Sequence, residues 1–408
     1  MKPFFQVKHS EDVYKLIASF PALAPENVPV GNARDRVLSG PLASPEDLPH
    51  FPRATMDGYA VRARDTFGAS ESIPALLTLT GEIGMGQSAR LPVSPGQCFR
   101  IATGGMLPPG ADAVAMIEHT QVLDHQTIEV FKAVSPGDHL IRVGEDLRQG
   151  QPIFSPGHRL RPQDLGLLAG VGIQQVSVFR RPRVAILSTG DEIVPIDQEP
   201  SPGYIRDINA YTLPALVEKS NGIPFFLGLV RDSREDLKKK LGEALDRTDM
   251  ILVSGGSSVG TRDFTLEVIE SFSDSRILAH GIAISPGKPT ILARIGEKVL
   301  WGLPGHTASA MVVFSIFVKP CLHRLEGAEP VKINPGLKAR LTRNLASAQG
   351  RDDYIRVALQ GGPQGWEAEP ILGQSGLIST LVRSDGLICI DRFTEGKEKG
   401  EWVEVMLF

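Results

Sequence analysis

The alternation of apolar and amphipathic segments between Arg183 and Gly327 constrains the fold of this chain most strongly. Three short apolar runs alternate with three helical patterns: Val184–Leu187, Ala210–Lys219, Phe225–Val230, Arg234–Leu245, Met250–Val253 and Phe264–Ser271. Such alternation predicts a mostly parallel sheet with helices on both faces, which is a three-layer α/β domain. We expect two more strands at Pro289–Ala293 and Lys298–Trp301, followed by a helix from Thr307 to about Arg324.

The rest of the 408 residues needs additional cores, because one core rarely organises so long a chain. Residues 29–140 read as short β segments, such as Ala75–Thr80 and Thr127–Phe131, between Gly and Pro turns. We expect a helical linking domain built from two separate segments, 1–28 and 141–178. The α/β domain would span 179–327, and strand-like segments predict a small β domain over 328–408.

Composition excludes several classes of protein. A formal charge of −4, with Lys and Arg spread along the chain, argues against a nucleic-acid partner. The apolar stretch Ala308–Val318 falls short of the roughly 20 residues that span a bilayer, and Met1–Phe20 lacks the apolar run of a signal peptide. Three widely spaced cysteines fit a reducing compartment. We therefore expect a cytoplasmic protein with no membrane or nucleic-acid partner.

Three polar, glycine-rich segments follow predicted strands of the α/β domain: Ser188–Glu192, Ser254–Asp263 and Leu303–His306. The carboxyl ends of parallel strands share one edge of a sheet, and open α/β sheets bind ligands there. Glycines let the backbone approach a ligand, and helix N-termini attract anions. An anionic ligand at this edge is the prediction, although Thr189–Glu192 alone fits a turn whose Asp caps a helix equally well.

The same edge also carries Asp191, Glu192, Asp232 and Asp263. Clustered carboxylates repel an anion unless a cation intervenes, and Mg2+ is the cation usually shared between carboxylates and phosphates. Lys288, held between prolines, would fix a positive charge near an oxyanion, with a solvated turn lysine as the alternative. His306 has no second His at metal spacing, which favours a helix-cap role.

Two segments of the N-terminal half, Thr55–Tyr59 and Ile101–Gly105, gather small polar residues in turns. A functional and a purely structural interpretation remain open for both of them on these grounds.

Taken together, the motifs of the chain resemble those of the molybdopterin molybdenumtransferase family, called MoeA in bacteria and the E domain in gephyrin. The matching motifs, in order, are Met56–Ala60, Thr103-Gly104 with Leu107-Pro108 and Gly110–Asp112, Gly144–Asp146, Ser188–Glu192, Gly255–Asp263, Pro286–Pro289 and Gly302–Gly305. The resemblance implies a β-rich domain with a helical linking domain, a MogA-like α/β domain and a C-terminal β-barrel. It also implies a homodimer with active sites between subunits.

The resemblance also implies roles for individual residues. Asp57 and Thr103 would reach the active site from the partner subunit. Glu192, Asp232 and Asp263 would hold Mg2+ and the adenylate. The molybdate pocket would contain Lys288, Ser309, Arg351 and Ser375, with Ser379 as an alternative to Ser375. Further substrate-binding residues would be Asp146, Thr189, Gly190, Asp191, Gly255, Gly256, Ser258, Pro289, Pro304 and Gly305.

The implied activity is Mg2+-dependent insertion of molybdate into adenylylated molybdopterin with release of AMP. Two alternatives remain open: an ATP-using molybdopterin adenylyltransferase, which leaves about half of the chain unused, and a non-catalytic scaffold. The upstream adenylyltransferase is an expected partner. The chain departs from the family at Ser257, where Val is usual, at Ser285, where some members have Lys, and at His306-Thr307, where Asn-Pro is usual. These departures leave the choice between molybdate and tungstate open.

Overall fold

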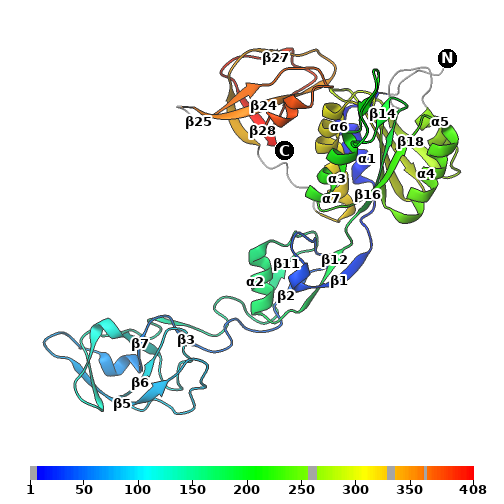
Figure 1. Cartoon of the computed structure of the whole chain (residues 1–408). Helices are drawn as coiled ribbons and strands as arrows, with labels where there is room; N and C mark the ends of the chain where they lie inside the picture. Colours follow the sequence, from blue (N-terminus) through cyan, green and yellow to red (C-terminus); the bar gives the residue numbers. More distant parts are fainter. Residues whose placement is uncertain (1–6, 256–263, 329–335, 363–364) are drawn as a thin grey trace.

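The computed structural model describes residues 7–255, 264–328, 336–362 and 365–408, and it is elongated (Figure 1). The α/β domain and a small β-barrel lie at one end. A β-rich domain lies at the opposite end, and a narrow linking unit joins the two ends. The chain thus separates two groups of predicted site residues along its length.

The α/β domain is built on a six-stranded sheet of order β16-β13-β17-β21-β20-β18. Its strands are β13 (Arg183–Thr189), β16 (Ile223–Val230), β17 (Met250–Ser254), β18 (Ser275–His280), β20 (Ile291–Ile295) and β21 (Lys298–Leu303). The first four strands of that order are parallel to one another. Strand β20 is antiparallel to β21, and β18 is antiparallel to β20. The prediction of a mostly parallel sheet is confirmed.

Helices cover both faces of this sheet because buried strand residues alternate between two cores. Val184 and Ile186 of β13 pack with α3 (Asn209–Lys219) and the helical run Thr307–Leu325. Ala185 and Leu187 pack on the other face with α4 (Arg234–Arg247) and α5 (Phe264–Glu270). Period-two alternation of apolar side chains produces this three-layer arrangement.

Helix α1 (Ser10–Ala18) packs differently from the expectation that grouped residues 1–28 with the linking domain. Val13 and Ile17, four residues apart on one face, are buried in the α/β core. The Tyr14 hydroxyl donates to the Ile316 carbonyl at 2.9 Å. The long apolar helix beside α1 offers more surface to bury than the linking unit does, which explains the difference.

That helix consists of α6 (Thr307–Val313), the π-helical turn η4 (Phe314–Val318) and α7 (Lys319–Leu325). With 19 residues and a mean hydropathy of 1.3 in its most apolar window, it meets the length and composition of a membrane span. However, 67% of that window is buried inside the protein, where Phe314 and Phe317 belong to the α/β core. Burial in this core accounts for its hydropathy.

The β-rich domain contains a six-stranded sheet of order β7-β4-β6-β5-β9-β8. Its strands are β4 (Gly58–Val61), β5 (Ala75–Ile83), β6 (Gln97–Ile101), β7 (Ala113–Met116), β8 (Thr120–Val122) and β9 (Thr127–Val130). The expected segments Ala75–Thr80 and Thr127–Phe131 lie in β5 and β9. Tyr59 and Val61 face one apolar core, whereas Ala60 faces another.

The linking unit places α2 (Pro162–Gly170) beside a two-stranded sheet in which β1 (Pro25–Pro29) pairs with β12 (Gln175–Phe179). Short strands β2 (Leu42–Ala43) and β11 (Pro152–Phe154) pair next to it, and β3 (Arg53–Ala54) pairs with β10 (Leu140–Ile141) toward the β-rich domain. Helix α2 lies within the segment 141–178, which was expected to be helical.

The C-terminal domain is a closed five-stranded barrel, as expected. Its strands are β22 (Leu337–Leu341), β24 (Asp352–Gly362), β25 (Gly365–Pro370), β26 (Gly386–Ile390) and β28 (Trp402–Leu407), and the β24–β26 pairing closes it. A short strand β27 (Gly396–Lys397) pairs with β23 (Leu345–Ala346) beside the barrel. Helix α8 (Ser379–Val382) precedes β26.

Candidate active site at the sheet edge and the barrel

Three predicted site loops lie side by side at the carboxyl edge of the α/β sheet. They follow β13, β17 and β21, which are adjacent parallel strands. Ser188 aligns with Ser254, and Ser254 aligns with Leu303. Parallel pairing therefore brings Thr189, Gly255 and Pro304 to one edge, as the sequence predicted.

The backbones of these loops approach so closely that only glycine fits at one position. Gly255 has a φ of +103°, and a Cβ placed there would lie 2.2 Å from the Thr189 carbonyl oxygen. A Cβ at Gly305 would lie 3.7 Å from the Gly255 Cα. The Gly255 N–H donates to the Leu303 carbonyl at 3.1 Å. The loops are thus in direct backbone contact, and Gly305 is the exposed residue at this contact.

Three predicted carboxylates also gather at this edge. The Asp232 N–H donates to Asp191 Oδ1 at 3.1 Å, and a Cβ on Gly190 would lie 2.9 Å from Glu192 Oε2. Partial burial raises the pKa of Asp232, and the neighbouring Asp191 and Glu192 carboxylates raise it further. This mutual repulsion, among oxygen-only ligands, fits a site that would hold Mg2+.

Within the described ranges, no group of three or more acidic, His or Cys side chains is arranged to hold a metal ion. Asp263, the other predicted Mg2+ ligand, lies outside the described residues, as do Gly256 and Ser258.

A second set of predicted residues meets where the barrel joins the α/β domain. The short strand β19 (Ile284–Ser285) pairs in parallel with β24. The Ile282 N–H donates to the Lys288 carbonyl, and the Asp352 N–H donates to the Ala283 carbonyl, both at 2.9 Å. Lys288 and Arg351 are therefore anchored at adjacent residues of one segment, and both side chains are exposed.

Ser375 of the barrel contacts the start of the helix that follows β21. His306 Nδ1 and Ser375 Oγ are 2.9 Å apart, and the Ala308 N–H donates to the Ser375 carbonyl at 3.3 Å. Ser309 is buried in the next position of α6, and Pro304 is buried before it. These contacts place Ser375 beside α6, whereas Ser379 lies on α8.

The remaining predicted residues lie elsewhere. Asp57 Oδ1 accepts hydrogen bonds from the Thr103 N–H at 2.7 Å and from the Thr103 hydroxyl at 2.8 Å, which lower the pKa of Asp57. This exposed pair belongs to the β-rich domain, at the far end of the chain from the sheet edge (Figure 1). Asp146 is exposed in the loop after β10. Pro289 follows Lys288 and is half-buried.

The residue that the sequence analysis missed is Asn209, which lies at the start of α3 and contacts two of the edge loops. A usable signal was present, because Asp207 and Asn209 immediately precede the predicted helix Ala210–Lys219, as capping residues do. Asp207 Oδ1 indeed accepts from the Ala210 N–H at 2.9 Å.

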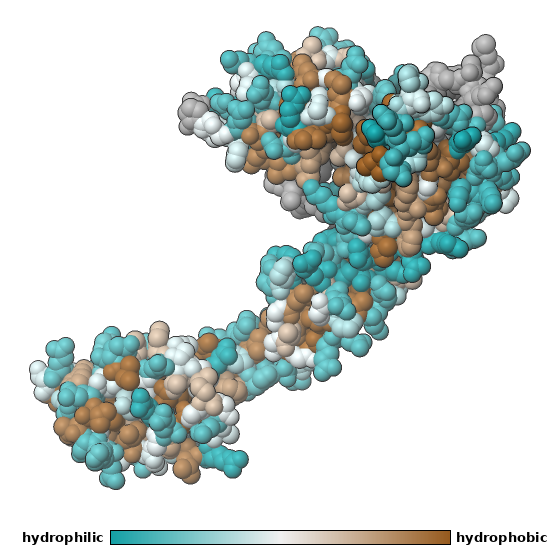
Figure 2. All heavy atoms as spheres, in the orientation of Figure 1, coloured by the Kyte–Doolittle hydropathy of each residue, from teal (hydrophilic) through white to brown (hydrophobic). Residues whose placement is uncertain are grey.

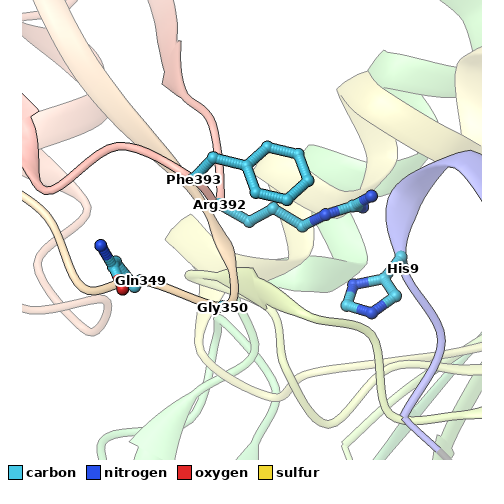
Figure 3. Close-up of a pocket in the computed structure, with 5 residues that line it drawn as sticks. All are labelled: His9, Gln349, Gly350, Arg392 and Phe393. Carbon is cyan, nitrogen blue, oxygen red and sulfur yellow. The ribbon is translucent and has the colours of Figure 1, made fainter.

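A separate hollow of about 520 Å³ lies between the start of α1 and the barrel (Figure 3). It is lined by His9, Gln349, Gly350, Arg392 and Phe393. Arg392 pairs with Glu11 at 3.3 Å there. None of its lining residues belongs to the predicted site, although Gly350 directly precedes Arg351.

Three family models match the chain in order: the MoeA N-terminal region (domain I and II) at residues 8–172, a probable molybdopterin binding domain at 185–324, and the MoeA C-terminal region (domain IV) at 338–408. A molybdopterin molybdenumtransferase of Haemophilus influenzae is 33% identical over 92% of this chain and 92% of its own length. That of Bacillus subtilis is 30% identical over 94% and 89%. The crystal structure of a molybdopterin biosynthesis MoeA protein from Pyrococcus horikoshii OT3 is 31% identical, with a TM-score of 0.85 over 99% of this chain and 100% of that one.

Proposed function

Because the chain belongs to the MoeA family of molybdopterin molybdenumtransferases, an enzyme family of molybdenum cofactor biosynthesis, we propose that it inserts molybdate into adenylylated molybdopterin and releases AMP with the help of Mg2+. The observation that carries the proposal is the convergence of two sets of residues. Asp191, Glu192 and Asp232 gather at the glycine-rich sheet edge, and the barrel brings Arg351 and Ser375 to the same domain.

The carboxylates Glu192, Asp232 and Asp263 would hold Mg2+, which would neutralise the pyrophosphate when bound. The backbone at Thr189, Gly255 and Gly305 would cradle the adenylate. Lys288 and Arg351 would hold molybdate as substrate beside the dithiolene, and Ser309 and Ser375 would orient its oxygens. Fixing both reactants at neighbouring positions makes the transfer effectively intramolecular.

The two exposed cations and the exposed edge also suit tungstate, so the oxyanion preference must be measured. The barrel distinguishes the proposed activity from adenylyl transfer, because adenylyl transfer at the sheet edge would leave Arg351 and Ser375 of the barrel without a role. We also propose a cytoplasmic location, and the molybdopterin adenylyltransferase as the partner that supplies the substrate.

The test is release of AMP from adenylylated molybdopterin with Mg2+ and molybdate or tungstate. Glu192→Ala and Asp263→Ala should each lower the rate by about 100-fold, which corresponds to about 2.7 kcal/mol of transition-state stabilisation. Asp246→Ala is the matched control, because this exposed acid lies on α4 of the same domain. Wild-type rates in the Glu192 and Asp263 variants would refute the proposal, and a wild-type protein without turnover would favour the scaffold role.

A further inference from the structure

Asn209 joins separate loops of the candidate site through one side chain. It is the first residue of α3 and only 6% exposed. Its Nδ2 donates to Ser254 Oγ at 2.5 Å and to the Gly305 carbonyl at 3.0 Å. Because the Gly305 carbonyl can only accept, the amide nitrogen must face it, which fixes the orientation of the side chain.

The segment that carries Asn209 is also tied to the carboxylate loop. The Ile205 N–H donates to the Glu192 carbonyl and the Asp207 N–H to the Val194 carbonyl, both at 2.9 Å. The Asp207 carboxylate then caps α3 at Ala210. The start of α3 is thus bonded to the loops after β13 and β21 and to the last residue of β17.

Stability alone does not account for this arrangement. The Oδ1 atom of Asn209 is buried and, among the described residues, has no hydrogen-bond partner. A buried acceptor left without a partner costs stability, so such groups in native proteins call for another explanation. The position of Asn209 offers such an explanation. Its two hydrogen bonds fix the distance between Ser254, which precedes Gly255 in the chain, and Gly305, which lies beside Gly255 in space.

We propose that Asn209 is a positioning residue that holds the three edge loops at the spacing needed to bind the adenylate. This inference rests on the proposed function and deepens it. Asn209 acts through the Gly255 and Gly305 backbones, because its own side chain is too buried to reach a ligand. Without the amide, the Gly305 carbonyl loses its link to Ser254, and only the Gly255–Leu303 backbone bond still joins these two segments beyond the paired strands.

The experiment measures AMP binding in the presence of Mg2+ by calorimetry, together with AMP release and thermal unfolding. Asn209→Ala should weaken AMP binding at least about 10-fold and lower kcat/KM to a similar extent. Asn209→Asp keeps the shape of the side chain but cannot donate to Gly305, so it should lose at least as much. Ser254→Ala keeps the Gly305 bond and should lose less.

Asn221→Gly is the matched control. Asn221 lies just after the opposite end of α3, and its Nδ2 also donates twice, to the Asp35 carbonyl at 3.0 Å and to Glu326 Oε1 at 2.9 Å. Glycine is chosen because the φ of Asn221 is +63°. A similar fall in melting temperature is expected for Asn209→Ala and Asn221→Gly, with unchanged AMP binding in the control.

The outcomes separate this inference from the proposed function. A wild-type protein that does not bind AMP would overturn both. Normal AMP binding and turnover by Asn209→Ala, with a wild-type protein that binds AMP, would overturn only the positioning role. Should Asn209→Ala fail to fold, Ser254→Ala decides, and wild-type AMP binding in that variant would count against the inference.

Discussion

At the scale of single residues, Gly255 shows how backbone geometry determines the site. An alanine Cβ at this position would lie 2.2 Å from the Thr189 carbonyl oxygen and 2.8 Å from Thr189 Oγ1, and the backbone has a φ of +103°. The nearer of these two atoms belongs to the backbone and cannot rotate away, so the loops themselves must separate. We therefore predict that Gly255→Ala abolishes AMP binding and lowers the free energy of unfolding by about 1–3 kcal/mol.

Calorimetry and urea unfolding measure the two effects, with Gly242→Ala as the control in the same domain. Gly242 lies inside α4, and a Cβ there would meet nothing within 4 Å. Alanine should stabilise this helix by about 0.5–1 kcal/mol without changing AMP binding. Normal AMP binding by Gly255→Ala would show that the close approach of the two loops is not needed.

His306 is a second residue whose contacts carry a prediction. Its ring nitrogen lies 2.9 Å from Ser375 Oγ, which is the contact between the α6 start and a predicted molybdate residue. A net hydrogen bond contributes about 0.5–1.5 kcal/mol. His306→Ala should therefore raise the molybdate concentration for half-maximal AMP release by about 2- to 10-fold, with AMP binding unchanged.

Steady-state kinetics with varied molybdate, repeated with tungstate, measure this effect. Ser375→Ala should shift the same parameter, and Ser379→Ala, at an exposed position of α8, should not. A larger shift in Ser379→Ala than in Ser375→Ala would reverse the assignment of the molybdate pocket.

At the scale of elements, the sequence predicted what depends on local periodicity. The strands around Val184 and Leu252 alternate buried side chains between two cores, and such runs are legible in the sequence. Strand β18 was missed because Arg276 and His280 interrupt its apolar pattern and a register shift falls between Ile277 and Ala279. Antiparallel pairing with β20 stabilises β18 as a strand, although its own apolar pattern does not predict one.

Tertiary contacts explain the other misses. The apolar face of α1 is visible in the sequence, but its partner, near Phe317, lies about 300 residues away along the chain. Tertiary contacts also limited what could be predicted of the candidate site. Glycine-rich loops after strands predicted Thr189 and Gly255, whereas the role of Asn209 depends on side-chain bonds that no spacing reveals.

Helix α7 contains a partly buried histidine, His323, whose ionisation affects stability. Burial lowers the pKa of His323 to about 4, and the nearby Arg159 and Lys319 add to this effect. The ordinary pKa of His is about 6.5, so between pH 7 and pH 5 the unfolded chain takes up a proton that the native protein does not. Stability therefore falls as the pH falls through this window, by up to about 2 kcal/mol from this residue.

His323→Gln removes this contribution, and its loss of stability between pH 7 and pH 5 should be smaller than that of the wild type. Urea unfolding at both pH values, followed by circular dichroism, measures the difference. Glu326, whose pKa is raised by burial, is present in both proteins and cancels in the comparison. An identical pH dependence in the two proteins would contradict the partly buried, neutral state of His323.

At the scale of the whole molecule, the elongated shape separates the Asp57–Thr103 pair from the sheet edge (Figure 1). The linking unit is held to the α/β domain by polar contacts, since Arg159 bonds Glu326 at 2.6 Å and Asn221 donates to the Asp35 carbonyl at 3.0 Å. The side chain of Glu326 is only 2% exposed. A fixed linking unit keeps the β-rich domain extended, away from the sheet edge of its own chain.

The exposed surface of that domain suits contact with another protein. Met56 and Met85 are 43% and 65% exposed, and Met85 lies against Gly104, next to Thr103. Figure 2 shows brown, hydrophobic residues on this end of the molecule. These observations support the proposal that a second copy of the chain completes the site, with Asp57 and Thr103 facing the partner's Mg2+ ligands.

Subunit mixing tests this arrangement directly. If Asp57 acts across the interface, Asp57→Ala and Glu192→Ala homodimers each have two defective sites. In a mixed dimer, one site carries both substitutions and the other carries neither, because the two residues of each site come from different chains. Random association makes half of the dimers mixed, so AMP release should recover to about a quarter of the wild-type rate. If both residues served the same site from one chain, each mixed site would keep one defect and activity would stay low.

Co-expression of the two variants with different affinity tags, followed by purification of the mixed dimer, raises the expected recovery to about half. Because each variant chain carries only one of the two substitutions, an intact site can form only where one chain supplies Glu192 and its partner supplies Asp57.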